Sequence, residues 1–504
     1  MSAKPTAPGE GQASTTEPGA GGSGGLGDMP AEEFRAAAHR LVDWVAEYLA
    51  HSERYPVLAR VKPGEIRAAL PGVAPARGEP FEAMLADVER ILVPGLTHWN
   101  HPGFFAYFAI TGSGPGILAD LLSSALNQQA MLWRTSPAAT ELEEVSLGWL
   151  RQMLGLPPAF EGVIYDTASV SSLHALAAAR EALVPDVRRS GLAGRADLPP
   201  LRVYCSEHAH SSIDKAVILL GLGHAALRKV PADTAFRMKA HDLREAIAED
   251  RARGVLPIAV VATVGTTSTT SVDPVPAIAE TCREHGLWLH VDAAYGGAAA
   301  LVPGFEWVMA GCDQADSVVV NPHKWLFVPF DLSAFYCRRM DTLRAAFSLV
   351  PEYLRTTDGA VKNLMDTGVQ LGRRFRALKL WMVLRYFGQQ GMRARVAEHI
   401  RLAQGFAAWV DADPDFERMA PAPMSVVCFR ARPRAGARTE EQLEALNARL
   451  LEAVNDSGEV FLSHTKLEGR YVLRLAVGNL RTEERHVARA WALLREHASR
   501  LAAS

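Results

Sequence analysis

Lys324 stands directly after a short apolar run, a place where lysine is unusual. Residues 317–320 are Ser-Val-Val-Val, a pattern typical of a buried strand, and Asn321-Pro322 then favours a turn. Burial lowers the pKa of a lysine and leaves a neutral amine that can attack a carbonyl carbon. Lys324 is therefore a candidate nucleophile for covalent catalysis. The alternative is a surface lysine on a tight turn.

A second apolar run, residues 287–291, ends at Asp292 and is followed by small residues. The two runs are about one strand and one crossover apart, the separation of neighbouring strands in a parallel α/β sheet. Ligands bind at the carboxyl ends of such strands, so we expect Asp292 and Lys324 to face one pocket. Pyridoxal 5'-phosphate (PLP) needs such a pair, a lysine for the Schiff base and an acid at the pyridine nitrogen. A structural salt bridge is the alternative, but it leaves the two strand-end positions unexplained.

Two motifs carry a resemblance to a known family. His-Val-Asp-Ala-Ala-Tyr at 290–295 and Asn-Pro-His-Lys-Trp at 321–325 resemble the PLP-dependent group II decarboxylases, the aromatic-L-amino-acid decarboxylase family. The resemblance runs from about residue 29 to the C-terminus. It implies a fold-type-I PLP-dependent transferase fold, a small-molecule amino-acid substrate and a homodimer with shared active sites. It also implies that Lys324 forms the Schiff base and that Asp292 holds the ring nitrogen protonated.

The resemblance implies the remaining cofactor contacts. A Ser/Thr-rich segment at 162–172 precedes a helical pattern, and free N–H groups at a helix start form an anion site. Part of this segment matches the family's phosphate cup, but Asp166 replaces the usual glycine and is expected to point away or act as a cap. His210 matches the histidine that stacks on the pyridine ring, although a lone histidine there is more often structural. The expected catalytic residues are Lys324, His210 and Asp292, and the expected cofactor residues are Thr167, Ala168, Ser169, His210, Thr267, Asp292, Ala294, Asn321, His323 and Lys324.

An aromatic run broken by Pro and Gly, residues 97–108, suits one wall of a pocket for a flat ligand, or ordinary core packing. It resembles the family's substrate-pocket segment, but Ala109-Ile110 replaces the Pro-Thr of animal members, which argues against a dihydroxyphenyl substrate. By the same resemblance, Gln129 and Met131 reach into the partner's pocket. Arg474 matches an arginine near the family's active site, and a sheet-face ion pair is the alternative for it. The expected substrate residues are Trp99, Tyr107, Phe108, Gln129, Met131, Leu364 and Arg474.

A polar, irregular stretch at 347–368 is long enough to be functional. In the family it is a lid that carries a proton-donating tyrosine, and counting back from Leu371 places Leu364 at that position. A leucine has no proton to give, so another group must act. The candidates are Tyr353, Asp366, Thr367, a water molecule and His210; a gap in this alignment would bring Tyr353 to the position.

Hydrophobic periodicity predicts an α/β protein with a mostly parallel sheet covered by helices. The predicted strands are 163–165, 203–205, 259–264, 287–291 and 317–320, followed by strand-like runs at 425–429 and 471–477. Residues 1–27 are too poor in large apolar side chains to fold. We expect an N-terminal helical dimerisation segment at 28–113, a large PLP-binding domain at 114–387 and a smaller α+β domain at 388–504.

Composition narrows the partners and the compartment. The 504 residues carry a formal net charge of −3 and have no apolar run of membrane-spanning length, so neither nucleic acid nor membrane is indicated as a partner. Five scattered cysteines without CxxC spacing favour a reducing compartment and no metal site. There is no basic-then-apolar signal sequence, and a cytoplasmic location is expected.

These observations predict decarboxylation of an L-amino acid, with an aromatic one favoured, to the amine and carbon dioxide. A second hypothesis is an aldehyde synthase, in which oxygen captures the same carbanion. A third is a catalytically silent dimeric relative, against which the intact Lys324, Asp292 and His210 argue.

Overall fold

The computed structural model describes residues 27–349, 361–434 and 438–503. The chain divides into two compact units, one formed by Met1–Tyr55 and Ala59–Thr97 and the other by Pro56–Leu58 and His98–Ser504. The predicted disordered tail therefore lies, apart from its last residue, outside the described residues. So do residues 350–360 of the predicted lid, including Tyr353.

The N-terminal unit is helical, with α1 (Ala31–Ala50), α2 (Glu65–Ala69) and α3 (Phe81–Asp87). On α1 the side chain of Ala37 is buried, whereas Phe34 is 57% exposed and Val42 is 47% exposed. An amphipathic helix with large apolar side chains in solvent requires a further surface to cover it.

Seven strands form the central sheet of the larger unit. They are β1 (Glu161–Tyr165), β2 (Leu201–Ser206), β3 (Leu227–Val230), β4 (Leu256–Thr263), β5 (Trp288–Asp292), β6 (Ser317–Val320) and β7 (Ser333–Cys337). Their order is β1-β7-β6-β5-β4-β2-β3, parallel from β6 to β3 and antiparallel on both sides of β7. The predicted α/β fold of type I, with a mostly parallel sheet, is confirmed. Neither β3, which carries Arg228 and Lys229, nor β7 was predicted.

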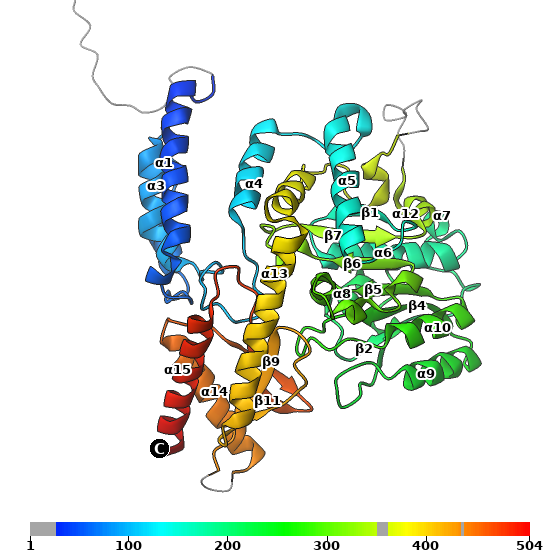
Figure 1. Cartoon of the computed structure of the whole chain (residues 1–504). Coiled ribbons are helices and arrows are strands. Elements are labelled where there is room, and N and C mark those ends of the chain that lie inside the picture. Colours follow the sequence, from blue (N-terminus) through cyan, green and yellow to red (C-terminus); the bar gives the residue numbers. More distant parts are fainter. Residues whose placement is uncertain (1–26, 350–360, 435–437, 504) are drawn as a thin grey trace, which may run out of the picture. The chain divides into compact units, whose positions relative to one another are not determined.

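Helices cover both faces of this sheet (Figure 1). Over the described ranges, no helix combines the length and the apolar composition needed to cross a membrane. The helices of the larger unit are α4 (Gly114–Leu126), α5 (Pro137–Met153), α6 (Ala168–Leu183), α7 (Val187–Ser190), α8 (Ser212–Leu219), α9 (Ala240–Ala252), α10 (Val275–His285), α11 (Pro322–Trp325), α12 (Met340–Phe347), α13 (Ala377–Ala412), α14 (Glu440–Asp456) and α15 (Glu484–Ala503).

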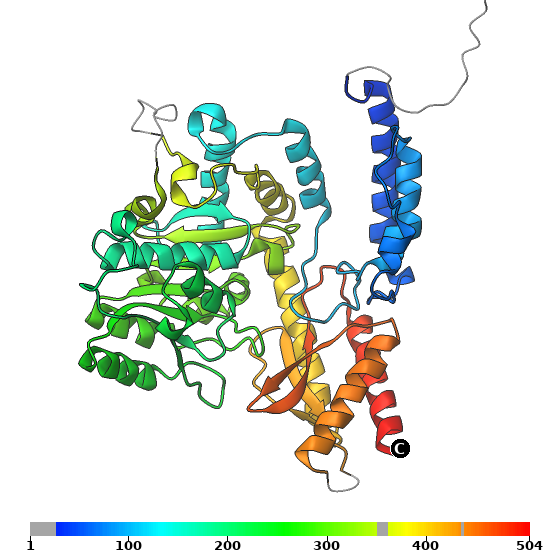
Figure 2. The same cartoon turned by 180° about the vertical axis from the view of Figure 1, so that it is seen from behind.

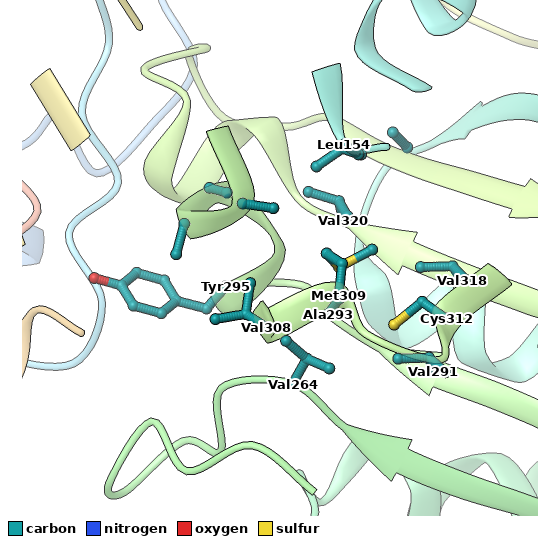
Figure 3. Close-up of a cluster of buried hydrophobic side chains, with 14 of the residues drawn as sticks. Leu154, Val264, Val291, Ala293, Tyr295, Val308, Met309, Cys312, Val318 and Val320 are labelled. Atoms are coloured by element: carbon teal, nitrogen blue, oxygen red, sulfur yellow. The ribbon is translucent and has the colours of Figure 1, made fainter. Parts of the chain in front are cut away.

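Strand alternation divides the side chains of β5 and β6 between two cores. Val291 on β5 lies on the same face as Val318 and Val320 on β6, and this face packs against Leu154 and Met309 (Figure 3). Successive residues of a strand point to opposite faces, so His290 and Asp292 point the other way, towards the face covered by α6. The His290 Nε2 atom lies 3.1 Å from the hydroxyl of Ser172 on α6. The sheet thereby aims Asp292 at the side on which α6 begins.

Helix α13 begins at Ala377 and continues to Ala412, with Gly388 at φ 63° and ψ 172° as a kink inside it. Glycine adopts this positive φ without the steric cost that other residues meet. Figure 1 shows α13 in yellow, passing from the seven-stranded sheet to the four-stranded sheet below it.

That second sheet is antiparallel and has the order β10-β11-β9-β8. Its strands are β8 (Phe416–Arg418), β9 (Val426–Ala431), β10 (Ser463–Leu467) and β11 (Arg470–Ala476), and two of them confirm the predicted runs at 425–429 and 471–477. Helices α14 and α15 pack on it and form a separate core (Figure 2). Thr439 and Gln442 close a reciprocal capping box at the start of α14.

Four buried histidines make the fold sensitive to acid. Burial lowers the pKa of His174, His290 and His399 to about 4 and that of His323 to about 3. Unfolded histidines titrate near 6.5, so below that pH the unfolded chain takes up protons that the folded chain does not. Stability is fully present above pH 6.5 and is lost as the pH falls. Between pH 6.5 and 5.5 we expect the free energy of unfolding to fall by about 1 kcal/mol per histidine.

Urea denaturation at a series of pH values measures this loss. The variant His399→Gln removes one of the four histidines. The unfolded chain then takes up one proton fewer, so the slope of unfolding free energy against pH is expected to fall by the contribution of one histidine. An unfolding free energy that stays constant from pH 7 to pH 5.5 would contradict the assignment of these histidines as neutral.

Candidate active site

Lys324 lies where β6 passes into the short helix α11. Every residue of β6 is buried, and Asn321 is the N-cap residue of α11. The Lys324 N–H donates to the Asn321 carbonyl at 2.9 Å. Burial lowers the pKa of Lys324, and the nearby charge of Asp292 opposes that shift. The amine lies 5.3 Å from the centre of the Phe108 ring, so it has the desolvated surroundings that favour a nucleophilic lysine.

A cavity of about 200 Å³ adjoins the Lys324 side chain. The expected cofactor residues come from five separate segments of the chain, and all of them line this cavity. A larger cavity of about 350 Å³, with Leu301 and Arg393 in its wall, contains none of them. The residues of the smaller cavity are Phe108, Ile110, Thr167, Ala168, Ser169, His210, Thr263, Gly265, Thr267, Asp292, Ala294, Tyr295, Asn321, His323, Lys324 and Phe330.

The carboxyl ends of β4 and β5 supply an acid and a hydroxyl to this cavity. Asp292 is the register partner of Thr263, and Asp292 Oδ1 accepts the N–H of Ala294 at 3.1 Å. The Thr263 hydroxyl is buried and, among the described residues, has no hydrogen-bond partner. Buried polar atoms are almost always paired, so a lone hydroxyl in a cavity wall is an atom left for a ligand.

The start of α6 supplies the anion-binding end. Thr167 is the N-cap residue, and the N–H groups of Ala168 and Ser169 in the first turn have no intrahelical acceptor. Asp166 Oδ1 accepts the Thr167 N–H at 2.5 Å, and Oδ2 accepts the Gln370 side-chain amide at 3.1 Å. The carboxylate thus caps Thr167, one of the two roles expected for it.

His210 is held in one orientation. Its Nδ1 accepts the N–H of Ser212 at 3.1 Å and lies 2.9 Å from the Ser212 hydroxyl. Burial lowers the pKa of His210, with the neighbouring Asp292 opposing the shift. Because Nδ1 accepts a hydrogen bond, the proton of the neutral ring resides on Nε2. The ring therefore offers the cavity a donor on its free side.

Asn321 and His323 form the side of the cavity next to Lys324. The Asn321 amide lies 3.2 Å from His323 Nε2, and His323 Nδ1 accepts the Leu332 N–H at 2.8 Å. The Phe330 ring covers His323 at 4.8 Å between ring centres. Asn321 Oδ1 is buried and has no partner within the part of the chain that is described, so it is a second polar atom left for a ligand.

Of the expected substrate residues, only Phe108 lines this cavity. Trp99 and Tyr107 stack at 6.0 Å between ring centres, and Tyr107 is 55% exposed. Arg474 is buried, with its guanidinium carbon 5.6 Å from the centre of the Phe108 ring. Across the described residues it forms no ion pair, so the sheet-face ion pair weighed as its alternative is absent there.

Gln129, Met131 and Leu364 lie away from the cavity of their own chain. Gln129 Oε1 accepts the Arg373 N–H at 2.8 Å, and the Met131 carbonyl accepts the Met365 N–H at 3.1 Å. The Leu364 side chain is only 5% exposed and is part of the core between β1 and α6.

Five residues of the cavity were not predicted: Ile110, Thr263, Gly265, Tyr295 and Phe330. The sheet-edge rule that selected Asp292 applies equally to Thr263, which ends the neighbouring strand, and could have found it. Gly265 has φ +90°, and a Cβ there would lie 2.8 Å from the Gly296 nitrogen. Only glycine fits that close approach of two backbones.

Comparison with known proteins places this geometry in context. Residues 63–432 match the family model described as the pyridoxal-dependent decarboxylase conserved domain. Tryptophan decarboxylase 2 of Oryza sativa subsp. japonica is 39% identical over 96% of this chain and 99% of its own length. Phenylacetaldehyde synthase of a Rosa hybrid cultivar is 38% identical over 93% and 94%. The crystal structure of Oryza sativa TDC with PLP and tryptamine superposes with a TM-score of 0.91 at 38% identity, over 95% of this chain and all of that one.

Proposed function

The chain belongs to the pyridoxal-dependent decarboxylase family and is a PLP-dependent amino-acid decarboxylase, and from that premise we propose that it converts an aromatic L-amino acid to the amine and carbon dioxide. One observation carries the proposal. Lys324, Asp292 and His210 line a single cavity, with Phe108 in the same wall. The names of the relatives, which include a tryptophan decarboxylase, support the aromatic substrate class.

The polar groups that line the cavity fit the cofactor. The α6 start offers N–H groups and hydroxyls suited to a phosphate. Two buried polar atoms, Thr263 Oγ1 and Asn321 Oδ1, have no hydrogen-bond partner among the described residues. At the other end Asp292 offers a carboxylate to a protonated ring nitrogen. Lys324 would bond the aldehyde carbon, and the His210 ring would lie against the pyridine face.

When bound, PLP supplies an electron sink for the bond between Cα and the carboxylate. Asp292 keeps the proton on the ring nitrogen, which maintains that sink. Lys324 presents an amine whose lowered pKa leaves part of it neutral and nucleophilic. His210 carries its ring proton on Nε2, where it can be given to the substrate Cα after carbon dioxide has left. Phe108, which is buried, places an apolar ring in the cavity wall and so disfavours water beside the reacting atoms.

A substrate screen tests the proposal. Purified holoenzyme is supplied in separate reactions with L-tryptophan, L-tyrosine, L-phenylalanine and, as a non-aromatic comparison, L-glutamate, and carbon dioxide, amine, aldehyde and peroxide are measured together. We expect equal amounts of carbon dioxide and amine from at least one of the aromatic amino acids. Release from L-glutamate alone would overturn the aromatic class, and a protein that binds no cofactor would revive the silent relative.

An aldehyde synthase is the second candidate, because a phenylacetaldehyde synthase is among the similar chains. In that reaction the amino acid, oxygen and water give aldehyde, carbon dioxide, ammonia and hydrogen peroxide. Whether the product is the amine or the aldehyde depends on which group protonates Cα. In the family a lid tyrosine does so, and the matching position here is Leu364, which has no proton to donate. The Thr367 hydroxyl is committed to the Leu364 carbonyl at 2.6 Å, which makes Thr367 a poor donor.

Substituting the lid positions separates these outcomes. If Leu364 occupies the tyrosine position, Leu364→Tyr is expected to raise the ratio of amine to aldehyde or to speed amine release, because a phenol can donate the missing proton. Both products are measured in one assay, with Leu364→Phe as the control for ring size. No change in Leu364→Tyr together with loss of amine in Tyr353→Phe would assign the role to Tyr353, which lies outside the described residues.

A homodimer with shared sites is the assembly that α4 supports. Leu118, Leu121, Leu122 and Leu126 on this helix are each about half exposed, at 47–54%. A row of exposed leucines is costly in water and is typical of an interface. We propose that residues 28–113 form a dimerisation segment and that Gln129, Met131 and Leu364 act in the partner's site. Light scattering is expected to give the mass of two chains, and Leu122→Glu to shift it towards one.

We also propose a cytoplasmic location and a division of the remaining chain into a PLP-binding domain at 114–387 and a smaller domain at 388–504. All five cysteines are buried and unpaired, which supports a compartment that keeps thiols reduced. The two sheets, which fall on either side of residue 388, support the domain boundary.

A further inference from the structure

The buried guanidinium of Arg474 joins two loops that line the cavity. Its Nη2 donates to the Thr267 carbonyl at 2.7 Å, and its Nε donates to the Ser268 carbonyl at 2.8 Å. Its Nη1 donates to the Ser463 hydroxyl at 3.0 Å and to the Tyr107 carbonyl at 3.4 Å. An arginine has five N–H donors, so these contacts leave one for any other acceptor.

The two loops need such a link. Tyr107 has φ 51°, a left-handed conformation that is unfavourable for a residue with a Cβ and persists only where its surroundings hold it. The Tyr107 N–H donates to the Ser463 hydroxyl at 3.2 Å, so the same serine contacts both Tyr107 and Arg474. The residue that follows this strained turn, Phe108, lines the cavity together with Thr267.

We propose that Arg474 is a positioning residue that fixes the Tyr107–Phe108 turn against the Thr267–Ser268 turn and does not bind the substrate carboxylate. The inference rests on the proposed function, because it concerns the pocket for an aromatic amino acid. Its physical basis is that most N–H donors of the Arg474 guanidinium are already occupied, because they donate to three main-chain carbonyls and one hydroxyl. A carboxylate could bind the Arg474 guanidinium in a bidentate manner only by breaking these hydrogen bonds, which would leave buried carbonyls unpaired.

Two ligands distinguish positioning from carboxylate binding. Indole-3-propionate carries the carboxylate and has no amine, so the enzyme cannot turn it over, whereas tryptamine lacks the carboxylate. Calorimetric titration of the holoenzyme gives a dissociation constant for each. In Arg474→Gln we expect both constants to rise together by about tenfold, with their ratio unchanged. Arg474→Lys should be equally impaired, because a lysine is a point charge that cannot span four acceptors. A rise confined to indole-3-propionate, restored by Arg474→Lys, would overturn the proposal.

Arg430 offers a matched control on the neighbouring strand β9. It is also 3% exposed, but it pairs with Glu417 and Glu440 and does not line the cavity. Arg430→Gln should leave both dissociation constants unchanged. If the Arg474 variants do not fold, Ser463→Ala decides: a smaller parallel rise in both constants supports positioning, and no change contradicts it. The proposed function is judged separately, by whether the wild-type enzyme releases carbon dioxide from an aromatic amino acid.

Discussion

Lys324→Ala is expected to lower the turnover rate by orders of magnitude while the protein stays folded. The amine that would bond the cofactor's aldehyde carbon is lost, and with it covalent catalysis. The side chain lines a cavity and is not packed in the core, so alanine there removes few contacts and the melting temperature should change little. Steady-state release of carbon dioxide, with cofactor content measured on the same sample, checks the expectation.

Lys379 is the matched control for that experiment. It is 2% exposed and pairs with Asp120 at 3.2 Å, but it does not line the cavity. Lys379→Met is expected to retain turnover. Borohydride treatment of the wild-type holoenzyme, followed by peptide mapping, should attach the cofactor to the peptide that contains Lys324. Attachment to Lys379 or any other lysine refutes the assignment.

Asp292→Asn is expected to give an enzyme that still binds its cofactor but decarboxylates very poorly. An amide cannot hold a proton on the ring nitrogen as a carboxylate does, so the electron sink is weakened. Loss of a positioned proton-holding group costs roughly 10²–10⁴-fold in rate. Because Asn keeps the shape and can accept the Ala294 N–H, the fold should persist. Single-turnover kinetics on cofactor-saturated protein isolates the chemical step.

A second carboxylate near the same sheet edge separates chemistry from structure. Asp273 is buried and accepts the N–H groups of Met238 at 2.7 Å and Thr263 at 2.8 Å, but it does not line the cavity. Asp273→Asn should lower the melting temperature more than Asp292→Asn does and lower the rate much less. Near-wild-type decarboxylation by Asp292→Asn would remove Asp292 from the mechanism.

The cofactor end of the site could be predicted from the sequence because its signals are local. Asp292 ends one apolar strand and Lys324 follows shortly after the next, and strands adjacent in a parallel sheet bring their carboxyl ends to one edge. The hydroxyl-rich start of α6 is likewise a feature of one short segment. Such positions can be predicted once the fold class is known, and the sequence motifs indicated the fold class.

The substrate end could not be predicted in the same way because its contacts are non-local. Alternation on β11 shows which face Arg474 points to, but its partners Thr267 and Tyr107 lie 207 and 367 residues away in the sequence. Helix α13 likewise depends on contacts that are distant in the sequence. It packs against α4 and α5 and against β8 and β9, and Gly388 interrupts its helical backbone with φ 63° and ψ 172°.

The position of β1 in the sheet has a consequence for biosynthesis. In the seven-stranded sheet β1 has a single neighbour, β7, paired from Glu161↔Cys337 to Tyr165↔Ser333. The ribosome makes β1 and the phosphate-binding start of α6 first among these elements, but β1 cannot pair until residues 333–337 have emerged. Chain closure over so long a segment is slow, and the cup of Thr167–Ser169 is therefore set against Lys324 late. A nascent chain that ends before β7 carries every residue that lines the cavity but lacks the strand that pairs with β1, so the phosphate-binding start of α6 is fixed in place only after the last strand of the sheet has been made.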